Sequence, residues 1–474
     1  TKGTVAKSAI CGAGPYQIEN VKVTATGYYT NNTPSGAMRT FGVLQPTFAI
    51  ESLMDICSEK LGIDPIELRM INGMKDGAVT HTRQVLGKVA YTETLKKCSE
   101  IAGWEVGSSR VRGSVRKDIK GSQIAEPYIP GKEFKSEEAM KLCRDRFKYG
   151  RGVGTGWYGI GRCATIDKAG AFVEIDDGGT AMILTGVSEI GEGILTVLTQ
   201  IAADELGMYP EDITIGDNDT ARVPEAAHVG ASRQTYMIGN AVCNACRDVK
   251  KKFIREMAAY WNIDSSSICM KNRRIYVEGN AQYNLSLKEA VDICKKVRGI
   301  VPLGSGTYTA HHEGLDPVDG RGNPWQAYVF GTQIAEVAVD TFTGEVHVLG
   351  IWAAHDVGRV INPRGVEGQI EGGAVQSMGQ TIMENYVLSE GVPTNKNFAK
   401  YILPTSVDVP EIHSYLVEER DPFSPVGAKG IGEPAPLPTA PAIVNAIYDA
   451  VGVRITSLPA IPEKILNEIS KMKN

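Results

Sequence analysis

One carboxylate of this sequence stands out because of the residues around it. Glu433 lies in "GAKGIGEPAPLPTAPAIVNAI", residues 427–447, between a glycine-rich bend and a run of four prolines. Glycines allow the backbone to approach another group closely, and prolines stiffen the chain that follows. A carboxylate held in this way is typical of a general base, but an exposed acid just before a helix shows the same pattern. The residue types leave both interpretations open.

Two further glycine bends, each followed by an expected helix, are candidates for ligand binding. They are "EIGEG" at residues 189–193 and "HVGASRQTYMIGNA" at residues 228–241. The first N–H groups of a helix have no partner within the helix, so such bends suit phosphates and other anions. Glu192 would repel a phosphate, whereas Ser232 and Arg233 are better phosphate partners. Many such bends are only tight turns, and Arg233 is equally consistent with covering a surface.

The metal-ligating residue types show no metal-binding pattern. The nine cysteines are scattered and odd in number, which is typical of reduced thiols and not of a disulfide framework. Cys243 and Cys246 form one CxxC pair inside an expected helix, and a single pair supplies only half of a tetrahedral zinc site. We therefore expect both cysteines to pack in a core, and no protein side chain is predicted to bind a metal.

Composition excludes several classes of function. The chain has 474 residues, of which 42% are hydrophobic and 22% charged, and a formal net charge of −5. No dense run of Lys and Arg indicates nucleic-acid binding. No apolar stretch reaches the roughly 18 residues of a membrane span, and the N-terminus lacks the apolar core of a secretion signal. These features predict a soluble cytoplasmic protein, unless the chain is a processed piece of something larger.

Two helices are expected near the N-terminus. Residues 47–62, "TFAIESLMDICSEKLG", have apolar residues at helical spacing and end at Gly62. The face expected to be buried consists of Ile50, Leu53, Met54, Cys57 and Leu61. A second helix is expected after Asp64 and Pro65, because Asp is a favoured N-cap and Pro is tolerated in the first turn.

A weak internal repeat indicates the organisation of the rest of the chain. Residues 171–186 have the alternating pattern of a β-hairpin, and residues 189–207 form a glycine bend and an apolar helix. The same order returns in the hairpin of residues 332–352 and the helix of residues 370–384. The repeat predicts an α+β fold of two related subdomains, each a hairpin or mixed sheet with helices, around a shared cleft.

Six motifs resemble the molybdenum-binding subunit of the molybdenum hydroxylases, the xanthine dehydrogenase and aldehyde oxidoreductase family. "GAKGIGEPAPLPTAPAIVNAIYDAVGVRI" is similar to the signature at the end of that subunit, and "TPSGAMRTFGVLQPTFAIESLMD" is similar to its segment before a long helix. Four others follow in the family's order: "LGIDPIELRMIN", "GEGILTVLTQIAADELG", "ASRQTYMIGNA" and "AAHDVGRVINPRGVEGQIEGG". The resemblance covers most of the chain apart from residues 105–150.

The resemblance implies a division of the chain. Residues 1–104 would form an N-terminal segment with helices and a loop beside the pocket, and residues 105–150 an insertion or linker. Residues 151–300 and 301–474 would form the first and second molybdopterin-binding subdomains, the second carrying the loop of Glu433. Together they would form half of a cleft for a molybdenum–molybdopterin cofactor.

The resemblance also implies roles for particular residues. Glu433 matches the family's catalytic base, which takes a proton from a molybdenum-bound hydroxide. Phe41 matches a phenylalanine that flanks the substrate, and Arg39 lies two residues before it at the pocket. Residues matching cofactor-contacting positions are Gly191, Glu192, Gly193, Gly230, Ala231, Ser232, Arg233, Lys429 and Gly430.

Departures from the family pattern bear on the partners. Glu192 stands where relatives have a glutamine that reaches the cofactor, and Thr40 replaces a glycine beside Phe41. The family's earlier half of the subunit, a four-cysteine cluster pattern and a flavin signature are missing. We therefore expect half of a split molybdenum subunit, similar to the arrangement in nicotinate dehydrogenase. Its partners would be the other half of the molybdenum subunit, a 2Fe-2S subunit and an FAD subunit.

The implied function is that of a molybdenum-dependent hydroxylase. It would oxidise an electron-poor carbon of an N-heteroaromatic (purine or nicotinate-like) or of an aldehyde with water-derived oxygen, and pass electrons to the Fe-S and FAD partners. The cofactor would be the cytosine dinucleotide form, shared with a partner chain, in a dimer of the hetero-complex. The alternatives are a non-catalytic assembly subunit of such a complex, which Glu192 favours, and an aromatic acyl-CoA reductase of the same family.

Overall fold

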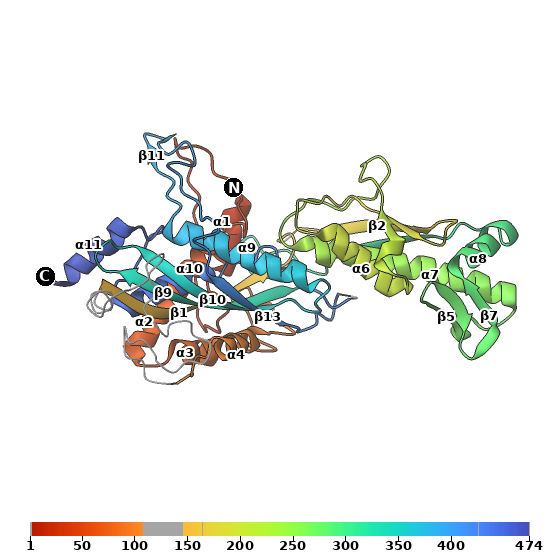
Figure 1. The fold of residues 1–474 in the computed structure, drawn as a ribbon, viewed down its shortest axis with the longest axis horizontal. Coiled ribbons are helices and arrows are strands. Elements are labelled where there is room, and N and C mark those ends of the chain that lie inside the picture. The colour runs from red at the N-terminus through yellow and green to blue at the C-terminus, as the bar shows by residue number, and fades with distance from the viewer. Residues whose placement is uncertain (1, 108–145, 164, 425, 474) are drawn as a thin grey trace, which may run out of the picture.

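The computed structural model describes residues 2–107, 146–163, 165–424 and 426–473, and it is elongated, with two lobes (Figure 1). The terminal lobe contains both described ends of the chain. The inserted lobe, residues 165–310, lies between two strands of the terminal lobe. Each lobe has a sheet with helices packed against it, so the α+β prediction is confirmed. Most of the insertion predicted at residues 105–150, with Cys143, lies outside the described residues.

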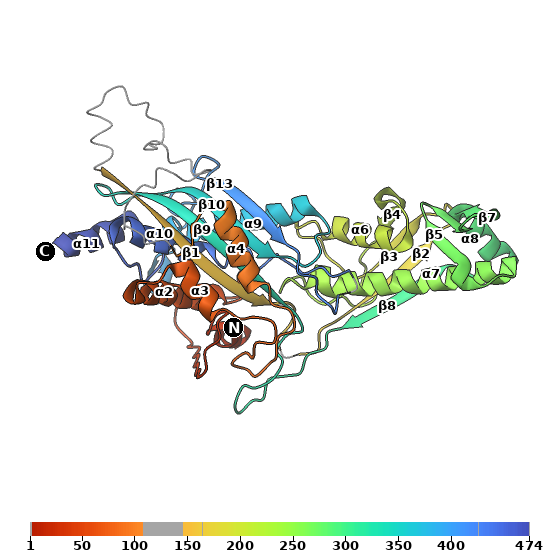
Figure 2. The same ribbon diagram turned by 90° about the horizontal axis from the view of Figure 1, so that it is seen from below.

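The terminal lobe has a mixed sheet of strand order β1-β9-β10-β13, in which only β10 and β13 are parallel. Its strands are β1 (Phe147–Gly159), β9 (Tyr328–Asp340), β10 (Val346–Asp356) and β13 (Glu411–Val417). Its helices are α1 (Lys2–Cys11), α2 (Leu44–Leu61), α3 (Pro65–Asn72), α4 (Tyr91–Ile101), α9 (Pro363–Ile382), α10 (Thr439–Val451) and α11 (Pro462–Lys473). α10 packs against β1 and β9, and α4 packs against β9 and β10 (Figure 2).

The inserted lobe has a mixed sheet of strand order β4-β3-β2-β8, against which α7 packs. Its strands are β2 (Lys168–Ile175), β3 (Ala181–Leu184), β4 (Ile213–Ile215) and β8 (Leu303–Thr309). Its main helices are α6 (Ile194–Leu206) and α7 (Gly239–Trp261), which follows the π-helical turn η2 (Gln234–Ile238). A smaller unit contains β5 (Ile268–Lys271), β6 (Arg274–Val277), β7 (Asn280–Ser286), α8 (Leu287–Asp292) and η4 (Ile293–Val297).

The predicted repeat of hairpin, bend and helix is present. β2 and β3 form the first hairpin, β9 and β10 form the second, and α6 and α9 follow them. The apolar helix predicted after the first bend is α6, whose buried residues include Ile194, Leu198, Ile201, Ala202 and Leu206. β1 runs through the boundary predicted at residue 150. The pairing of β1 with β9 and that of β2 with β8 both cross the boundary predicted at residue 300.

Three local predictions hold: the end of α2, the cap of α3 and the burial of the CxxC pair. Gly62 ends α2 in a left-handed conformation, with φ of 67°, and the side chain of Asp64 caps α3. Cys243 and Cys246 are both buried in α7, as expected for core cysteines.

Within the described ranges, no group of three or more His, Cys, Asp or Glu residues is placed to hold a metal ion. No helix in those ranges is long and apolar enough to cross a membrane.

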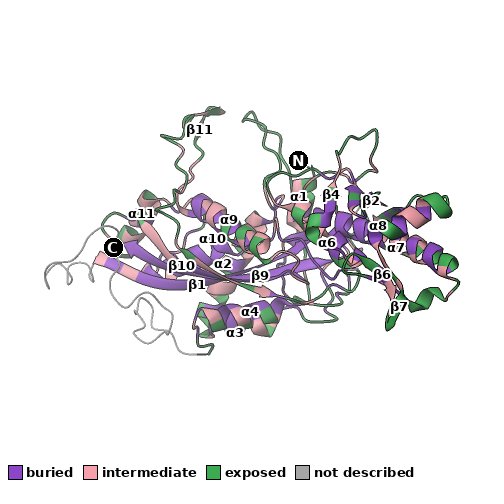
Figure 3. Cartoon of the chain, turned by 45° about the vertical axis from the view of Figure 1, so that its right-hand side comes forward, coloured by how far each residue is buried: buried purple, intermediate pink, exposed green. Residues whose placement is uncertain are grey.

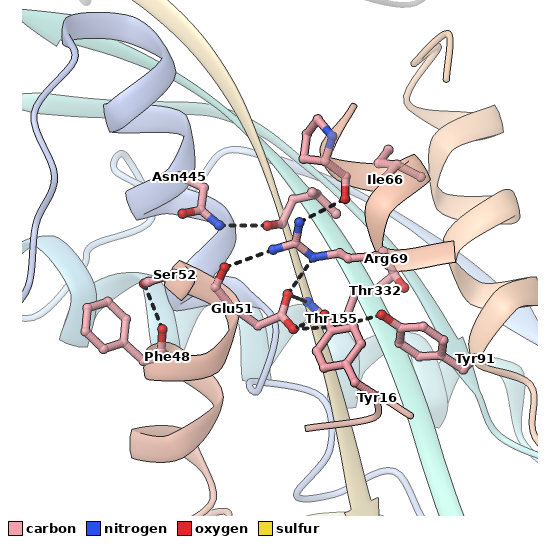
Figure 4. A network of polar contacts seen from close by, with 12 residues as sticks. Tyr16, Phe48, Glu51, Ser52, Ile66, Arg69, Tyr91, Thr155, Thr332 and Asn445 are labelled. Atoms are coloured by element: carbon pink, nitrogen blue, oxygen red, sulfur yellow. Dashed lines mark hydrogen bonds and ion pairs between the residues drawn. The ribbon is translucent and has the colours of Figure 1, made fainter. Parts of the chain in front are cut away.

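The apolar face predicted for α2 is only partly correct: Ile50 and Met54 pack against the core, but other members do not. Leu53 is 54% exposed and Leu61 is 62% exposed, whereas Glu51 is fully buried. The Glu51 carboxylate pairs with Arg69 of α3 at 2.8 Å and accepts a hydrogen bond from the backbone N–H of Thr155 at 2.9 Å (Figure 4). A buried carboxylate needs such partners, so a polar network, and not apolar periodicity, fixes which face of α2 packs inward.

Glycines in β1 bring α10 into direct contact with the strand backbone. A Cβ at Gly150, Gly152 or Gly154 would lie well under 3.0 Å from backbone atoms of the α10 segment. The inserted lobe repeats this packing, because a Cβ at Gly304 or Gly306 of β8 would be equally close to the backbone of α7. Alternate residues of a strand share one face, so each lobe rests on a glycine face covered by a helix.

Two neighbouring segments project from the terminal lobe and are mostly exposed (Figure 3). They are residues 18–38 and residues 384–410, and the second contains β11 (Leu388–Ser389) and β12 (Val392–Pro393). Both carry exposed large apolar side chains, among them Tyr29 and Val407. Clusters of exposed apolar side chains are typical of surfaces that bind another protein.

We expect Gly152→Ala to lower the free energy of unfolding by about 1–3 kcal/mol, the usual range for overpacking. The reason is that the new Cβ would push α10 away from β1. Gly87→Ala is the matched control, because a Cβ at Gly87 would meet nothing within 4 Å. Denaturant unfolding measures both variants, and equal losses of stability would contradict the packing argument.

Candidate functional site

A cavity of about 550 Å³ lies where the two lobes meet, in the place predicted for a shared cleft. The inserted lobe lines the cavity with residues 190–194, Val197, and residues 229–235 except Ala231. The terminal lobe lines it with Arg39, part of residues 357–369, and residues 428–433. The cavity therefore brings together the loop of Glu433, both glycine bends and Arg39. Among the predicted site residues, Phe41 and Ala231 do not line it.

Glu433 is held at this cavity by the bend of residues 230–233. Its Oε1 accepts a hydrogen bond from the backbone N–H of Ala231 at 3.0 Å. Its own backbone N–H donates to Oγ of Ser232 at 2.9 Å. Its Oε2 is buried and has no hydrogen-bond partner among the described residues. One carboxylate oxygen is thus anchored, and the other is available for a further contact.

Burial raises the pKa of the Glu433 carboxyl above its usual value. Three groups act in the opposite direction: first the ammonium of Lys7, then the N–H of Ala231 and the guanidinium of Arg39. A desolvated carboxylate is a stronger base once it is ionised, and nearby positive charge favours the ionised form. This environment suits a proton acceptor.

The glycines before Glu433 are explained by contact between two loops. A Cβ at Gly430 would lie well under 3.0 Å from the carbonyl oxygen of Ser232, so only glycine allows the loops to meet. Ala231 and Ser232 have positive φ angles of 56° and 52°, which residues other than glycine rarely adopt. Such strained backbone is common at functional sites. The close approach predicted from these glycines is therefore to the second bend itself.

Two cations that line the cavity are already paired. The Arg233 guanidinium is fully buried and binds Asp167 at 2.7 Å. Lys429 forms a buried ion pair of 2.7 Å with Asp356. The sequence predicts Arg233 as a phosphate partner, but its full burial requires the carboxylate partner that it has. Neither side chain offers an uncommitted charge, so a ligand would meet these residues through their backbone.

The first bend is organised by an acid that the sequence analysis missed. Glu189 accepts hydrogen bonds from the N–H groups of Gly191 at 2.9 Å and Gly193 at 2.8 Å, and from Leu195 at 3.2 Å. These N–H groups were expected to be unpaired, but an acid before a helix is itself a signal for such capping. The Oε1 atom of Glu192 is buried and has no hydrogen-bond partner among the described residues. Burial raises the pKa of the Glu192 carboxyl, and the neighbouring Glu189 carboxylate raises it further.

Arg39 reaches the loop of Glu433, whereas Phe41 lies elsewhere. Arg39 donates from Nε to the carbonyl of Gly432 and from Nη2 to Oε1 of Gln369, the latter at 3.0 Å. The ring of Phe41 packs beside Gly3 of α1, where a Cβ would lie 2.9 Å from it. The substrate-flanking role of Phe41 stays a prediction. Gln369 was missed because nothing in the sequence relates α9 to the loop before α2.

The family model of the molybdopterin cofactor-binding domain matches residues 129–410, more than half of the chain. A second model with the same description matches residues 1–73. The chain belongs to the molybdopterin-binding family. In this molybdopterin-binding chain, Arg39 and both bends lie within the matched residues, and Glu433 lies after them.

The resemblance to xanthine dehydrogenases and aldehyde oxidoreductases is confirmed by similar proteins. The molybdopterin-binding chain is 32% identical to a probable xanthine dehydrogenase subunit of Bacillus subtilis over 97% of this chain and 56% of that protein. The aldehyde oxidoreductase from Desulfovibrio desulfuricans has a TM-score of 0.76 at 28% identity, over 98% of this chain and 45% of that chain. Quinoline 2-oxidoreductase from Pseudomonas putida shares the fold, with a TM-score of 0.81 at 24% identity, over 98% of this chain and 57% of that chain. The chain spans about half the length of these relatives.

We expect Gly430→Ala to lower both the free energy of unfolding, by about 1–3 kcal/mol, and the molybdopterin content of the purified protein. The new Cβ would separate Gly430 from Ser232 and release Glu433 from the second bend. Gly432→Ala is the control in the same loop, because its Cβ would be 3.8 Å from the nearest side-chain atom. A Gly430→Ala protein as stable and as loaded as Gly432→Ala would show that the loops need not touch.

Proposed function

We propose that this chain is the molybdenum-binding half-subunit of a multi-subunit hydroxylase, with Glu433 as the general base. The proposal rests chiefly on one observation: Glu433 has one oxygen anchored on Ala231 and a second, buried oxygen without a partner among the described residues, in the cavity between the lobes. The substrate class that we propose is an N-heteroaromatic (purine or nicotinate-like) or an aldehyde, oxidised at an electron-poor carbon with water-derived oxygen.

The residues of the cavity fit a bulky polar cofactor such as molybdopterin. A Cβ at Gly191 or Gly193 would meet nothing within 4 Å, so the first bend faces open space. The buried oxygens of Glu192 and Glu433 that lack partners among the described residues are suited to hydrogen-bond donors of such a group. The second bend would contact it through the backbone of Gly230 and Ser232, which line the cavity. When bound, the cofactor would supply a metal centre that activates water-derived oxygen and accepts the electrons of the substrate.

The chain's own contribution is to hold and receive a proton. Because Oε1 of Glu433 is engaged by Ala231, the proton would be received at Oε2. The bond from the Glu433 N–H to Ser232 and the bond from Arg39 to the Gly432 carbonyl keep that oxygen in one place. A general base in a fixed position contributes roughly 10²–10⁴-fold to a rate.

The proposed partners rest on the exposed apolar surface of the terminal lobe. We propose a companion chain with the other half of the molybdenum subunit. The exposed apolar side chains of residues 18–38 and 384–410 offer a surface for it. We further propose 2Fe-2S and FAD subunits as electron acceptors, and the cytosine dinucleotide form of the cofactor.

One observation favours a second function, that of a non-catalytic assembly subunit. Glu189 already occupies the N–H groups of Gly191 and Gly193, and Glu192 adds a second carboxylate to the same bend. An anionic cofactor group would meet fewer free donors there and more negative charge. This subunit would bury partner surface without holding the cofactor.

Glu433→Gln should lower turnover of the assembled complex by at least ~100-fold, because the amide keeps the shape but cannot accept the proton. Molybdenum content should stay normal, since the carboxylate is not needed to fill the cavity. Turnover with aldehydes and N-heteroaromatics and molybdenum content are measured on the same preparation.

Glu371→Gln is the matched control, since it makes the same chemical change at an exposed carboxylate of α9 outside the cavity lining. We expect its turnover to stay within about threefold of the wild type, because Glu371 has no proposed role in cofactor binding or proton transfer. A fully loaded Glu433→Gln complex with more than about half of the wild-type turnover would remove the carboxylate from the mechanism.

A cavity-filling change separates the two proposed functions. Val229→Trp would place an indole in the cavity, whereas Val318→Trp alters a residue that is 93% exposed and outside its lining. If the chain holds the cofactor, Val229→Trp should lower the molybdenum content of the co-purified complex by at least ~10-fold, which corresponds to about 1.4 kcal/mol. Unchanged molybdenum in a fully assembled Val229→Trp complex would support the assembly role instead.

A further inference from the structure

Lys7 is a buried lysine with little local compensation. It lies in α1 and is 3% exposed. Its Nζ is 3.5 Å from the carbonyl oxygen of Gly159, a long hydrogen bond, and 3.6 Å from the centre of the Tyr158 ring. Among the described residues, no carboxylate lies within ion-pair distance of it. Burying an ammonium in this way is unfavourable unless negative charge nearby offsets the loss of water.

Of the acidic groups that act on Lys7, only Glu433 can carry the negative charge that offsets the burial of its ammonium. Burial raises the pKa of the Cys11 thiol to about 12 and that of the Cys163 thiol to about 11, so both are neutral near pH 7. The aromatic neighbours, Tyr158 and Trp325, present their rings. After burial, which lowers the pKa of Lys7, the largest influence on it is the attraction of Glu433, which raises it.

Glu433 in turn has few sources of positive charge. Arg39 faces it, but the guanidinium is tied by hydrogen bonds to Gly432 and Gln369. The N–H of Ala231 engages only Oε1. A buried cation without an ion-pair partner among the described residues therefore lies in α1, and a buried acid oxygen without a donor lies in the loop before α10. The end of β1 connects them: Lys7 contacts the Gly159 carbonyl, and Gly161 donates its N–H to the carbonyl of Ala231 at 2.8 Å, the residue whose own N–H binds Glu433.

We propose that Lys7 is a positioning residue for the base: its buried ammonium is the counter-charge that keeps the Glu433 carboxylate ionised inside the protein. This inference rests on the proposed role of Glu433. α1 is fixed for the task, because Oγ of Ser8 donates to the carbonyl of Gly42, directly after the loop that carries Arg39. Both cations that act on Glu433 are therefore held by one packed unit.

The test is the pH dependence of the assembled complex with Lys7→Met and Lys7→Arg. Lys7 lowers the pKa of Glu433, so its removal should raise that pKa, and the acidic limb of turnover should move to higher pH by about one unit. Lys7→Arg keeps the charge and should leave the limb near its wild-type position. Infrared difference spectra across the same pH range follow protonation of the Glu433 carboxyl directly, with Glu433→Gln as the blank, in cofactor-free protein as well.

Each outcome decides the proposal. An upward shift in Lys7→Met that Lys7→Arg reverses supports it, and Lys7→Gln replaces Lys7→Met if the latter does not fold. If Lys7 acts in packing alone, Lys7→Met should change the thermal stability but leave the acidic limb of the turnover profile and the infrared titration of Glu433 unchanged. That result would overturn the inference. If Glu433→Gln keeps its turnover, the proposed function fails. If Glu433→Gln is inactive and Lys7→Met titrates normally, only the inference about Lys7 fails.

Discussion

The packing of α10 on the glycine face of β1 is the constraint on which the position of Glu433 depends. Without side chains at Gly150, Gly152 and Gly154, the helix rests on the strand backbone, and it cannot shift without losing that contact. α10 begins at Thr439, and the prolines between it and Glu433 transmit its position to the loop. Gly430 then fixes the other side of the loop against Ser232. The carboxylate is held from both directions by backbone.

Around this frame, buried charge is almost always paired. Glu51 binds Arg69, Arg233 binds Asp167, and Lys429 binds Asp356. Pairing of this kind is the ordinary solution to burial, and it accounts for two cations that line the cavity. Against that background the Oε2 of Glu433 is an oxygen of a buried acid without a partner among the described residues, and it belongs to a residue that lines the cavity, where a ligand can supply the missing donor.

The sequence predicts elements well where local rules govern them, and less well where a distant partner decides. The stop at Gly62, the cap at Asp64 and both hairpins follow from turn and capping preferences, and the structure has them. The inward face of α2 does not follow from such local rules, because Glu51 is buried against a partner on α3, and the apolar periodicity of α2 carries no information about that partner. Likewise the loop of Glu433 could be singled out from its glycines and prolines. The pairing of Arg233 with Asp167 could not, since Asp167 directly precedes β2 and is far from Arg233 in the sequence.

The insertion of one lobe between β1 and β9 has a consequence for how the chain folds during synthesis. β1 must wait for β9, which is made only after the whole inserted lobe, and its glycine face must wait still longer for α10. Pairings between segments so far apart in sequence form slowly, and an unpaired strand edge is prone to aggregation meanwhile. The inserted lobe can close its own sheet first, because β2, β3, β4 and β8 all lie within it. The loop of Glu433 would then be among the last parts of the chain to become ordered, after both lobes have formed.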